Sequence, residues 1–567
     1  MVRLGVFAAG LAFAGLTIAA RGGAAGWGVV AAVVAFVGLV VWHERVIRRR
    51  DRARRSVAYF DRGLARLEDR WIDGGDDGAR FADETHLYSG DLEAFGRGSL
   101  FHLLSTTRTE AGASRLAAWL KTPATPEIIR ERQLAVRELA EHLELRHDLA
   151  VVAPAEGRAL DSTSLRSWLA DAPASLPGWL GPVAATLAAL NVSAAAAALA
   201  GWVPGALVAV PLLASAALAM WVRPSVSRIL AEADRPTREL KVVALLAERV
   251  RAERFRSLIL SRLGADLMAP GRSPGLVVAS LERQVDLVDA RRNQLFMPIA
   301  GAVLLGTQLA CRIERWRRTF GPAATEWLDQ VADLEALASL ATHAFEHPDD
   351  AFPEISPPGS PVEARGLAHA LLPLSRAVRN DLVVGGAIRL VMVSGSNMSG
   401  KSTLLKALGS NLVLGFAGAP VRATSLTTPP LAIGASLVLR DSLLEGRSRF
   451  YAEVLRLKDI VALADAGTPT LFLLDELLSG TNSHDRAIGA RGVLEGLVGR
   501  GAIGLVTTHD LALTQIATDL GPRAVNIHLE DRLIAGRLEF DYRLKPGVVE
   551  RTNALELMRA VGLVTPE

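Results

Sequence analysis

The chain has 567 residues, too many for one hydrophobic core, so we expect two to four structural units. Half of the residues (50%) are hydrophobic and the mean hydropathy is +0.26, which is high for a soluble enzyme and indicates contact with lipid. The single cysteine, Cys311, excludes an internal disulfide and gives no cysteine-based metal site. The net charge of +3 is too small to indicate nucleic-acid binding by itself.

Residues 1–55 predict a transmembrane helical hairpin with a basic flank. Leu4–Ala20 and Gly22–Trp42 contain no charged residue, and each approaches the roughly 20 apolar residues that a membrane-spanning helix needs. A cleaved signal peptide is the alternative for the first stretch; we favour the hairpin because motifs further along belong in the cytoplasm. An arginine run follows, as is typical of cytoplasmic flanks: Arg45, Arg48, Arg49, Arg50, Arg52, Arg54 and Arg55.

Residues 56–98 are expected to form a linker, and residues 99–171 the first part of a helical core. The 51 residues 172–222 then contain no charge, which predicts a second transmembrane hairpin with a turn near Gly201–Gly205. The alternative is an alanine-rich helical pair buried in a soluble core.

Residues 223–350 return to amphipathic helices and form the second part of the core. Apolar residues recur every three or four positions from Leu328 to Phe345, which predicts one buried helical stripe. Asn293–Cys311 is also uncharged, but we expect a core or interfacial helix there. A fifth span would place the arginine run and the following domain on opposite sides of the membrane.

Residues 351–567 carry the pattern of a nucleotide-hydrolysing α/β domain. A strand-like run, Leu390–Val393, leads into G-x-x-x-x-G-K-S and then a helix-like segment. In such a loop, backbone N–H groups surround the phosphates of ATP, Lys401 reaches the β and γ oxygens, and Ser402 holds Mg²⁺. The residues assigned to the nucleotide are Gly395, Ser396, Asn397, Met398, Ser399, Gly400, Lys401, Ser402 and Thr403.

Two further apolar strands end in residues suited to hydrolysis. After Thr470–Leu474, we expect Asp475 to hold the Mg²⁺ shell and Glu476 to position and deprotonate the attacking water. After Ile503–Thr507, we expect His509 to contact the γ-phosphate or orient that water. The alternative for His509 is an ordinary loop histidine.

These motifs resemble the ATPase of the MutS family, which belongs to the ABC class of P-loop ATPases. The loop is close to the family's GPNMGGKST and departs from it at Ser396 and Ser399. Ser448–Glu453 resembles the family's S-T-F-M-x-E, and Asn380-Asp381 its ND pair. His369 lies where an HP pair is expected, although alanine follows it, and residues 542–547 resemble the closing segment.

The helical region resembles the MutS core domain. Thr109–Pro123 follows the family's T-x-x-G-x-R-x-L-x-x-W-L-x-x-P pattern, and Asp333–Ala341 resembles the last core helix. The resemblance implies an all-α MutS-like core domain followed by an α/β P-loop ATPase domain. The transmembrane hairpins precede and interrupt the core.

The resemblance also implies ATP and Mg²⁺ as cofactors, a homodimer in which Ser448 completes the partner's nucleotide site in trans, and DNA as a partner. The stretch before Ser99 leaves no room for a mismatch-reading domain, and the chain stops at Glu567 without a nuclease domain, so mismatch recognition is not expected. We therefore expect a multi-pass protein of the inner (cytoplasmic) membrane whose cytoplasmic ATPase domains clamp DNA. The alternatives are an ABC-type membrane ATPase and a nucleotide-driven protein scaffold without DNA binding.

Overall fold

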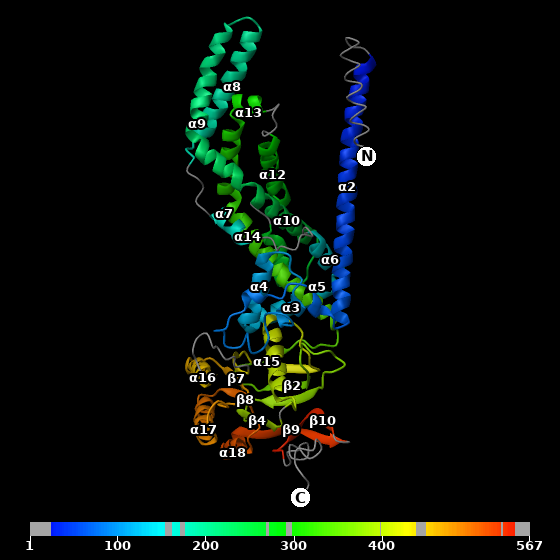
Figure 1. Ribbon diagram of the computed structural model, residues 1–567, viewed down its shortest axis with the longest axis vertical. Coiled ribbons are helices and arrows are strands. Elements are labelled where there is room, and N and C mark those ends of the chain that lie inside the picture. The colour runs from blue at the N-terminus through cyan, green and yellow to red at the C-terminus, as the bar shows by residue number, and fades with distance from the viewer. Residues whose placement is uncertain are drawn as a thin grey trace.

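The computed structural model describes residues 24–152, 162–170, 176–267, 272–290, 297–396, 398–437, 449–534 and 537–549. The molecule is elongated (Figure 1). A mixed α/β domain lies at one end, a helical region occupies the middle, and two apolar helical columns project from the other end. The expected order, a helical region followed by an α/β domain, is confirmed.

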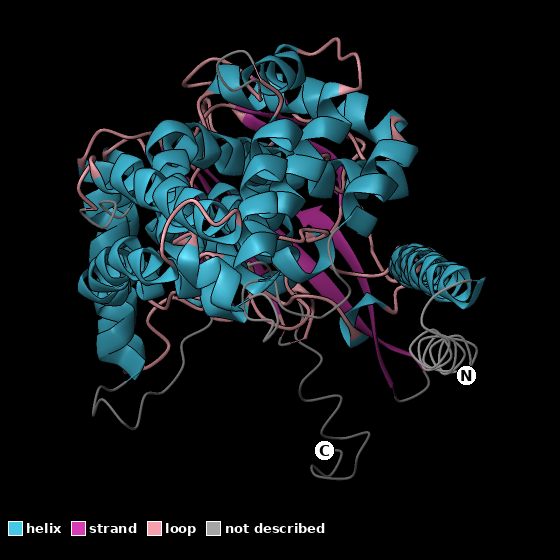
Figure 2. Cartoon of the chain, turned by 90° about the horizontal axis from the view of Figure 1, so that it is seen from above, coloured by secondary structure: helices cyan, strands magenta, loops and turns pink. Residues whose placement is uncertain are grey.

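The first column is α2 (Ala24–Leu67), a single helix of 44 residues that is about 66 Å long at 1.5 Å per residue. Its first half exposes apolar side chains such as Val30 and Val34. Its second half packs beside α6 (Leu143–Val152), where the Phe60 and His147 rings stack. Figure 2 shows α2 nearly end-on at one side of the helical bundle. The first expected span, Leu4–Ala20, lies outside the described residues.

The helical region is built around α14 (Leu305–Glu346), 42 residues long. The predicted apolar stripe on this helix is buried from Leu328 to Ala341, because α14 packs against helices on several sides. Asn293–Cys311 is described from Met297 onward, as α13 (Met297–Ala302) and the start of α14. The remaining core helices are α3 (Leu100–Leu104), α4 (Glu110–Lys121), α5 (Pro126–Glu141), α7 (Ser162–Ala170), α10 (Asp234–Arg251), α11 (Leu258–Asp266) and α12 (Pro274–Ala290).

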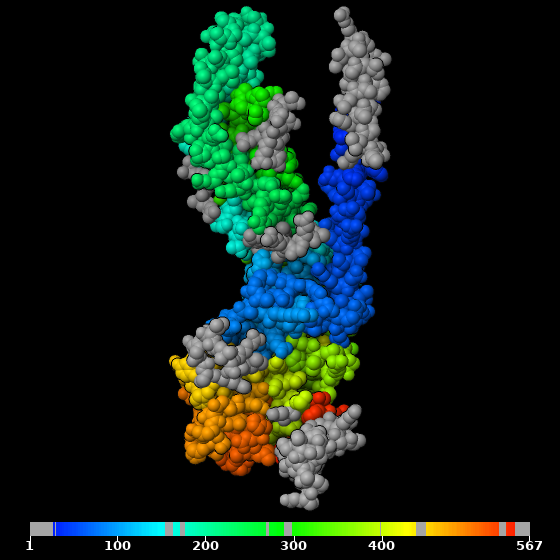
Figure 3. Space-filling view, in the orientation of Figure 1, coloured from blue at the N-terminus to red at the C-terminus, as the bar shows by residue number. Residues whose placement is uncertain are grey.

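The second column is the hairpin of α8 (Leu180–Leu199), η3 (Gly205–Val208) and α9 (Ala209–Glu232). Near its base it packs on α14, and Leu180 and Ala184 are buried there. Halfway along α8, Asn191 Nδ2 donates to Ser215 Oγ (2.8 Å) and to the Ala302 carbonyl (2.7 Å). Beyond this point the hairpin stands free, parallel to the α2 column (Figure 3).

In the described part of the chain, three helical segments are long and apolar enough to cross a membrane, by length and composition alone. They are Val30–Leu67, Leu180–Leu199 and Gly205–Arg251. The last two overlap the second expected hairpin, and the first begins inside the second span expected near the N-terminus.

The expected linker, residues 56–98, is instead folded. It contains the end of α2 and the short helices η1 (Trp71–Asp73) and η2 (Ala79–Phe81). Leu92 is buried against α15 (Lys401–Ala417), and the Leu87 carbonyl accepts a hydrogen bond from Ala435 N (2.8 Å) at the edge of the large sheet. The segment bridges the helical region and the α/β domain because it carries apolar residues that both can bury.

The α/β domain contains two sheets. The larger has the order β10-β9-β4-β8-β7-β6, in which β10 alone is antiparallel. Its strands are β4 (Leu390–Gly395), β6 (Ala432–Ser436), β7 (Thr470–Leu474), β8 (Ile503–Thr508), β9 (Ala524–Ile534) and β10 (Arg537–Pro546). The smaller has the order β1-β5-β2-β3, with β1 (Glu354–Ile355), β2 (Val362–Leu367), β3 (Asn380–Val384) and β5 (Ser425–Thr428). With α15, the helices α16 (Arg449–Asp465), α17 (Ser483–Gly499) and α18 (Leu511–Asp519) complete the domain.

Candidate functional site

The sheet topology brings three separate sequence motifs to one edge. Strands β4, β8 and β7 are parallel neighbours in that order, with Ser394 opposite Thr508 and Leu474 opposite Val506. All three strands are fully buried and end at the same side of the sheet. The glycine-rich turn after β4, the two acids after β7 and the histidine after β8 therefore lie side by side.

The turn between β4 and α15, residues 395–402, is called here the glycine loop. A Cβ at Gly395 would lie 2.8 Å from the Leu529 carbonyl oxygen and 2.8 Å from Ser399 Oγ, so a larger residue does not fit. Gly400 has φ 99° and Met398 has φ 68°, both in the left-handed region. Asn397 lies outside the described residues, and Met398 points its side chain outward, 84% exposed.

Lys401 begins α15 and is buried, although it carries a charge. Its Nζ donates to the carbonyl oxygens of Gly395 (3.0 Å) and Ser396 (2.7 Å), so the side chain folds back over its own loop. Burial lowers the pKa of the Lys401 ammonium, while Glu476, Asp475 and more distant Asp531 raise it. Ser402 and Thr403 follow in the first turn of α15, half-buried and exposed respectively.

The acids after β7 are held by Thr507, a residue that the sequence analysis did not assign to the site. The Thr507 hydroxyl donates to Asp475 Oδ1 and accepts from the backbone N–H of Glu476 (3.0 Å). Glu476 has φ 48°, a conformation that costs roughly 1–3 kcal/mol and is held by its surroundings. Thr507 could have been identified from the sequence, because it lies in β8, the strand next to β7, which leads to the two acids.

His509 lies 3.2 Å from Glu476, measured between Nδ1 and Oε1. Both side chains are partly exposed at the open edge of the sheet, so solvent or a ligand can reach them. The structure thus brings His509 together with Glu476, one of the two acids.

The turn that follows Glu476 is fixed by α16. Glu453, the acid of the Ser448–Glu453 segment, is buried, and its Oε1 accepts a hydrogen bond from Leu478 N (2.6 Å). A Cβ at Gly480 would lie 3.1 Å from Phe450 Cβ, so α16 packs closely on this turn. Ser448 itself lies outside the described residues.

The Asn380-Asp381 pair has a structural role in this fold. Asn380 Nδ2 donates to the Tyr542 carbonyl (2.9 Å), and its Oδ1 accepts from Leu544 N (2.8 Å), which holds an irregular point in β10. This contact positions Tyr542 so that its ring packs against the glycine loop. A Cβ at Gly400 would lie 3.0 Å from that ring. Sequence spacing did not indicate Tyr542 as a neighbour of the loop.

The glycine loop fits a bound phosphate chain on one observation. The hydroxyl oxygens of Ser396 and Ser399 are buried and have no hydrogen-bond partner among the described residues. Buried polar atoms without partners are uncommon and are explained where a ligand supplies the missing bonds. These serines occupy the two positions at which the loop departs from GPNMGGKST.

Comparison with known families gives two matches. Residues 391–566 match the family described as MutS domain V, and residues 85–170 match MutS domain III. The first match begins in β4 and includes the glycine loop, the two acids and His509. The second contains the Thr109–Pro123 segment and begins within the folded segment that the sequence analysis expected to be a linker.

Curated relatives resemble the chain over its C-terminal part. The DNA mismatch repair protein MutS of Natronomonas pharaonis is 32% identical over 253 residues, which are 42% of this chain and 28% of that protein. The endonuclease MutS2 of Thermomicrobium roseum is 32% identical over 257 residues, 42% of this chain and 32% of that protein. The endonuclease MutS2 of Thermus thermophilus is 34% identical over 196 residues, 34% of this chain and 25% of that protein.

The matched stretch thus spans about a third or less of each relative. The family resemblance inferred from the motifs is nevertheless confirmed by the two matched regions, residues 85–170 and 391–566. The chain therefore resembles MutS proteins in two regions, residues 85–170, which match MutS domain III, and residues 391–566, which match MutS domain V.

Proposed function

We propose that this chain is an ATPase of the MutS type, anchored in a membrane. The observation that carries the ATPase part is the meeting of Lys401, Asp475, Glu476 and His509 at one edge of the sheet. A buried cation, two adjacent acids and a glycine-rich turn at a helix N-terminus are the parts that phosphoryl transfer to water requires.

Each residue has a defined task in this proposal. Lys401 leaves the carbonyls of Gly395 and Ser396 and turns its ammonium toward the phosphate oxygens. Ser402 and Asp475 would hold Mg²⁺, which when bound would supply positive charge beside the phosphates. Glu476 takes the proton of the attacking water, and His509 orients the Glu476 carboxylate through the contact between Nδ1 and Oε1.

The test is the Glu476→Gln variant, which keeps the shape of the side chain and removes its basicity. We expect ATP binding close to wild type and turnover reduced at least a hundredfold, since general-base catalysis contributes about 10²–10⁴. Binding is measured by equilibrium titration and turnover by phosphate release. Wild-type turnover in this variant would refute the assigned base.

Membrane anchoring is the second part of the proposal, and it is supported by the parallel direction of the two columns. α2 and the α8–α9 hairpin project to the same side, away from the α/β domain (Figures 1 and 3). Helix α8 has 20 residues and is about 30 Å long, which matches the hydrocarbon thickness of a bilayer. One bilayer can therefore hold both columns.

The positions of tryptophan and arginine residues indicate where the two surfaces of this bilayer lie along the columns. Trp179 and Trp221 stack at the base of the hairpin, with ring centroids 5.8 Å apart, and Trp202 is 83% exposed at its tip. Tryptophan is enriched at both membrane interfaces, and arginine on the cytoplasmic side. Arg223 follows Trp221, as the arginine run follows Trp42, so both columns carry positive charge on the side of the α/β domain.

Cysteine labelling tests this topology in intact cells. Trp202→Cys, in a Cys311→Ser background, is expected to react with a membrane-impermeant maleimide added outside. Arg54→Cys in the same background is the matched control and is expected to react only after lysis. Protection of Trp202→Cys until lysis would contradict the membrane placement.

The proposal includes a homodimer in which Ser448 acts on the partner's nucleotide. Mixing tests this directly. A Lys401→Ala chain and a Ser448→Ala chain are each expected to be inactive alone, whereas the mixed dimer contains one intact composite site and regains activity. Failure of every mixture to exceed its components would exclude action in trans.

DNA is the proposed partner of the dimer, on the strength of the MutS domains and of relatives that carry the names of a DNA mismatch repair protein and endonucleases. Duplexes, junctions and single strands are expected to alter the ATPase rate. An ATPase rate that none of the three DNA forms changes would favour the second candidate, a nucleotide-driven membrane ATPase or protein scaffold. The two projecting columns also support this second candidate.

A further inference from the structure

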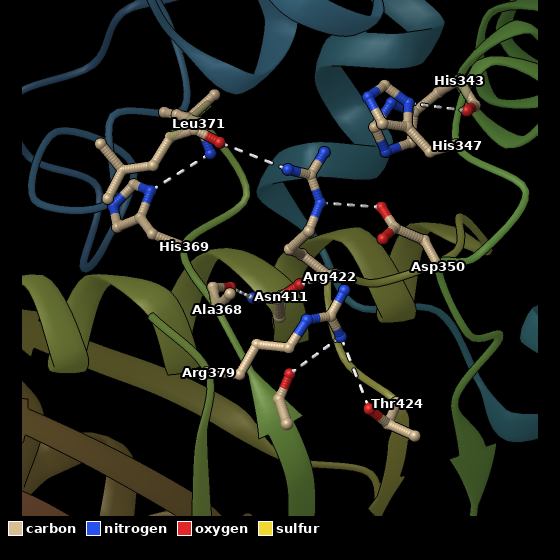
Figure 4. A network of polar contacts seen from close by, with 12 residues as sticks. His343, His347, Asp350, Ala368, His369, Leu371, Arg379, Asn411, Arg422 and Thr424 are labelled. Carbon is tan, nitrogen blue, oxygen red and sulfur yellow. Dashed lines mark hydrogen bonds and ion pairs between the residues drawn. The ribbon is translucent and has the colours of Figure 1, made fainter. Parts of the chain in front are cut away.

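Two histidines and an aspartate converge where the helical region joins the α/β domain. His343 lies in the last turn of α14, His347 directly follows that helix, and Asp350 lies in the chain leading to β1. One ligand atom from each lies within 4.8 Å of those of the other two. No other such group of histidine, cysteine or acidic residues occurs in the part of the chain that the structure describes. Figure 4 shows the three side chains around Arg422.

The His343 ring is buried, since the residue is only 3% exposed. A buried imidazole nitrogen needs a hydrogen bond or an ion as its partner.

The orientation of His347 suits the same ligand. Its Nδ1 lies 3.1 Å from the His343 carbonyl oxygen, to which a protonated Nδ1 donates. That bond leaves the Nε2 lone pair available and fixes the ring, as second-shell hydrogen bonds do for metal-binding histidines. The two histidines are four positions apart at the C-terminal end of α14, and their ring centroids lie 4.4 Å apart.

In the structure, Asp350 is already paired with a cation, the Arg422 guanidinium. Arg422 Nε donates to Asp350 Oδ2 at 3.1 Å, and both side chains are almost fully buried. Arg422 has other partners that would keep it in place without this bond: its Nη1 donates to the Leu372 carbonyl (3.3 Å), and its backbone N–H donates to Asn411 Oδ1 (2.6 Å). The guanidinium is thus the counter-ion of the Asp350 carboxylate and is held by further contacts as well.

We propose that His343, His347 and Asp350 bind one divalent transition-metal ion of the zinc class, in exchange for the Arg422 guanidinium. Two imidazoles and a carboxylate form a donor set that Zn²⁺ uses, with a fourth position left for water. The site is separate from the glycine loop and does not depend on the proposed ATPase.

The position of the site determines which parts of the fold a bound metal ion would affect. Glu346, next to the histidines in sequence, receives two hydrogen bonds of 2.7 Å from Arg66 at the end of α2. Arg422 is held by Asn411, which lies in α15, the helix that begins at Lys401. A bound ion would therefore release Asp350 from the Arg422 guanidinium and join it to the end of α14 instead, at the junction between the helical region and the α/β domain.

The experiment uses the full chain in detergent, purified without a polyhistidine tag and stripped by a chelator. Co²⁺ is titrated while its visible absorption is followed, and Zn²⁺ is then added in competition. We expect one saturable site per chain. His347→Gln, a substitution at a half-buried position, is expected to weaken Co²⁺ binding at least tenfold, whereas His142→Gln, at another half-buried helix end, leaves it unchanged.

A second variant separates metal binding from a purely structural role. Arg422→Gln removes the competing cation and is expected to strengthen Co²⁺ binding, which a structural ion pair alone does not predict. Circular dichroism checks that each variant is folded. The proposal is overturned if wild type shows no saturable site, if His347→Gln binds as wild type does, or if folded Arg422→Gln binds no more tightly.

Discussion

Gly112 on α4 and Glu335 on α14 lie so close that a Cβ at position 112 would stand 2.1 Å from Glu335 Oε2. Thr109, which caps α4, donates its hydroxyl to the same oxygen at 2.5 Å, and the backbone N–H groups of Arg108 and Thr109 also donate to this carboxyl. Arg115 pairs with Asp333 on α14, at 3.1 Å. The threonine, glycine and arginine of the T-x-x-G-x-R pattern thus all contribute to the packing of α4 on α14.

Gly112→Ala should destabilise the protein, because its methyl group overlaps a buried side chain that three hydrogen-bond donors hold in place. Overpacking of this kind costs about 1–3 kcal/mol, so the melting temperature should fall by several degrees. Gly264→Ala is the matched control. It lies in α11 with no atom within 4 Å of the added Cβ, and it should leave stability unchanged or slightly raised. An equal effect of the two substitutions would contradict the close contact.

Glu335 should make stability depend on pH. Burial raises the pKa of its carboxyl to about 7, while hydrogen bonds from Thr109 and Arg108 partly oppose the rise. A raised pKa means that the folded state favours the protonated form. The resulting stability is fully present below the ordinary pKa of about 4.5 and is lost as pH rises through about 7, on the order of 3 kcal/mol.

Melting temperatures measured from pH 5 to pH 8 test this dependence. Glu335→Gln, which cannot ionise, should flatten the decline seen in wild type over this range. Glu326→Gln, an exposed position on the same helix, should leave the decline as it is. Parallel curves for wild type and Glu335→Gln would show that another group titrates.

Lys401→Ala should abolish tight ATP binding, because the variant lacks the ammonium that the glycine loop holds beside Gly395 and Ser396. A loss of at least a hundredfold in affinity is expected, measured by titration with a fluorescent ATP analogue. Lys406→Ala changes a lysine on the same helix that pairs with Glu93 and should bind ATP as wild type does. Tight ATP binding by Lys401→Ala would show that Lys401 does not contribute to the nucleotide site.

Thr507→Val should slow hydrolysis and spare ATP binding. The variant keeps the shape of the buried side chain but loses the hydroxyl that joins Asp475 to the backbone of Glu476. We expect turnover to fall about tenfold, because a displacement of catalytic groups by about 1 Å already costs up to 10²-fold. Thr514→Val, on α18 and away from these acids, serves as the control in the same phosphate-release assay. Unchanged turnover in Thr507→Val would limit Thr507 to a packing role.

Much of the α/β domain could be predicted from local sequence. Lys401, Asp475 and His509 each follow a short apolar strand, and parallel strands bring such positions to one sheet edge. The spacing around Gly395 and Gly400 specifies a turn that only small residues allow. Each of these signals is contained in a few consecutive residues, so no tertiary information is needed to read it.

The tertiary structure decided which distant residues serve the site and the junction. Thr507 and Tyr542 reach the motifs through strand pairing, and residues 71–98 fold because they bury Leu92 between two domains. Arg422 meets Asp350 across 72 positions of the sequence.

Sequence alone therefore determined the MutS-type motifs and the apolar stretches, since both are local patterns of residue type. Only the fold decided that α2 and the α8–α9 hairpin project to the same side, that Gly112 faces Glu335, and that His343, His347 and Asp350 converge. The physical reason is that these relationships depend on how α14 packs against its neighbours. That packing is settled by the shapes of buried side chains from many segments at once.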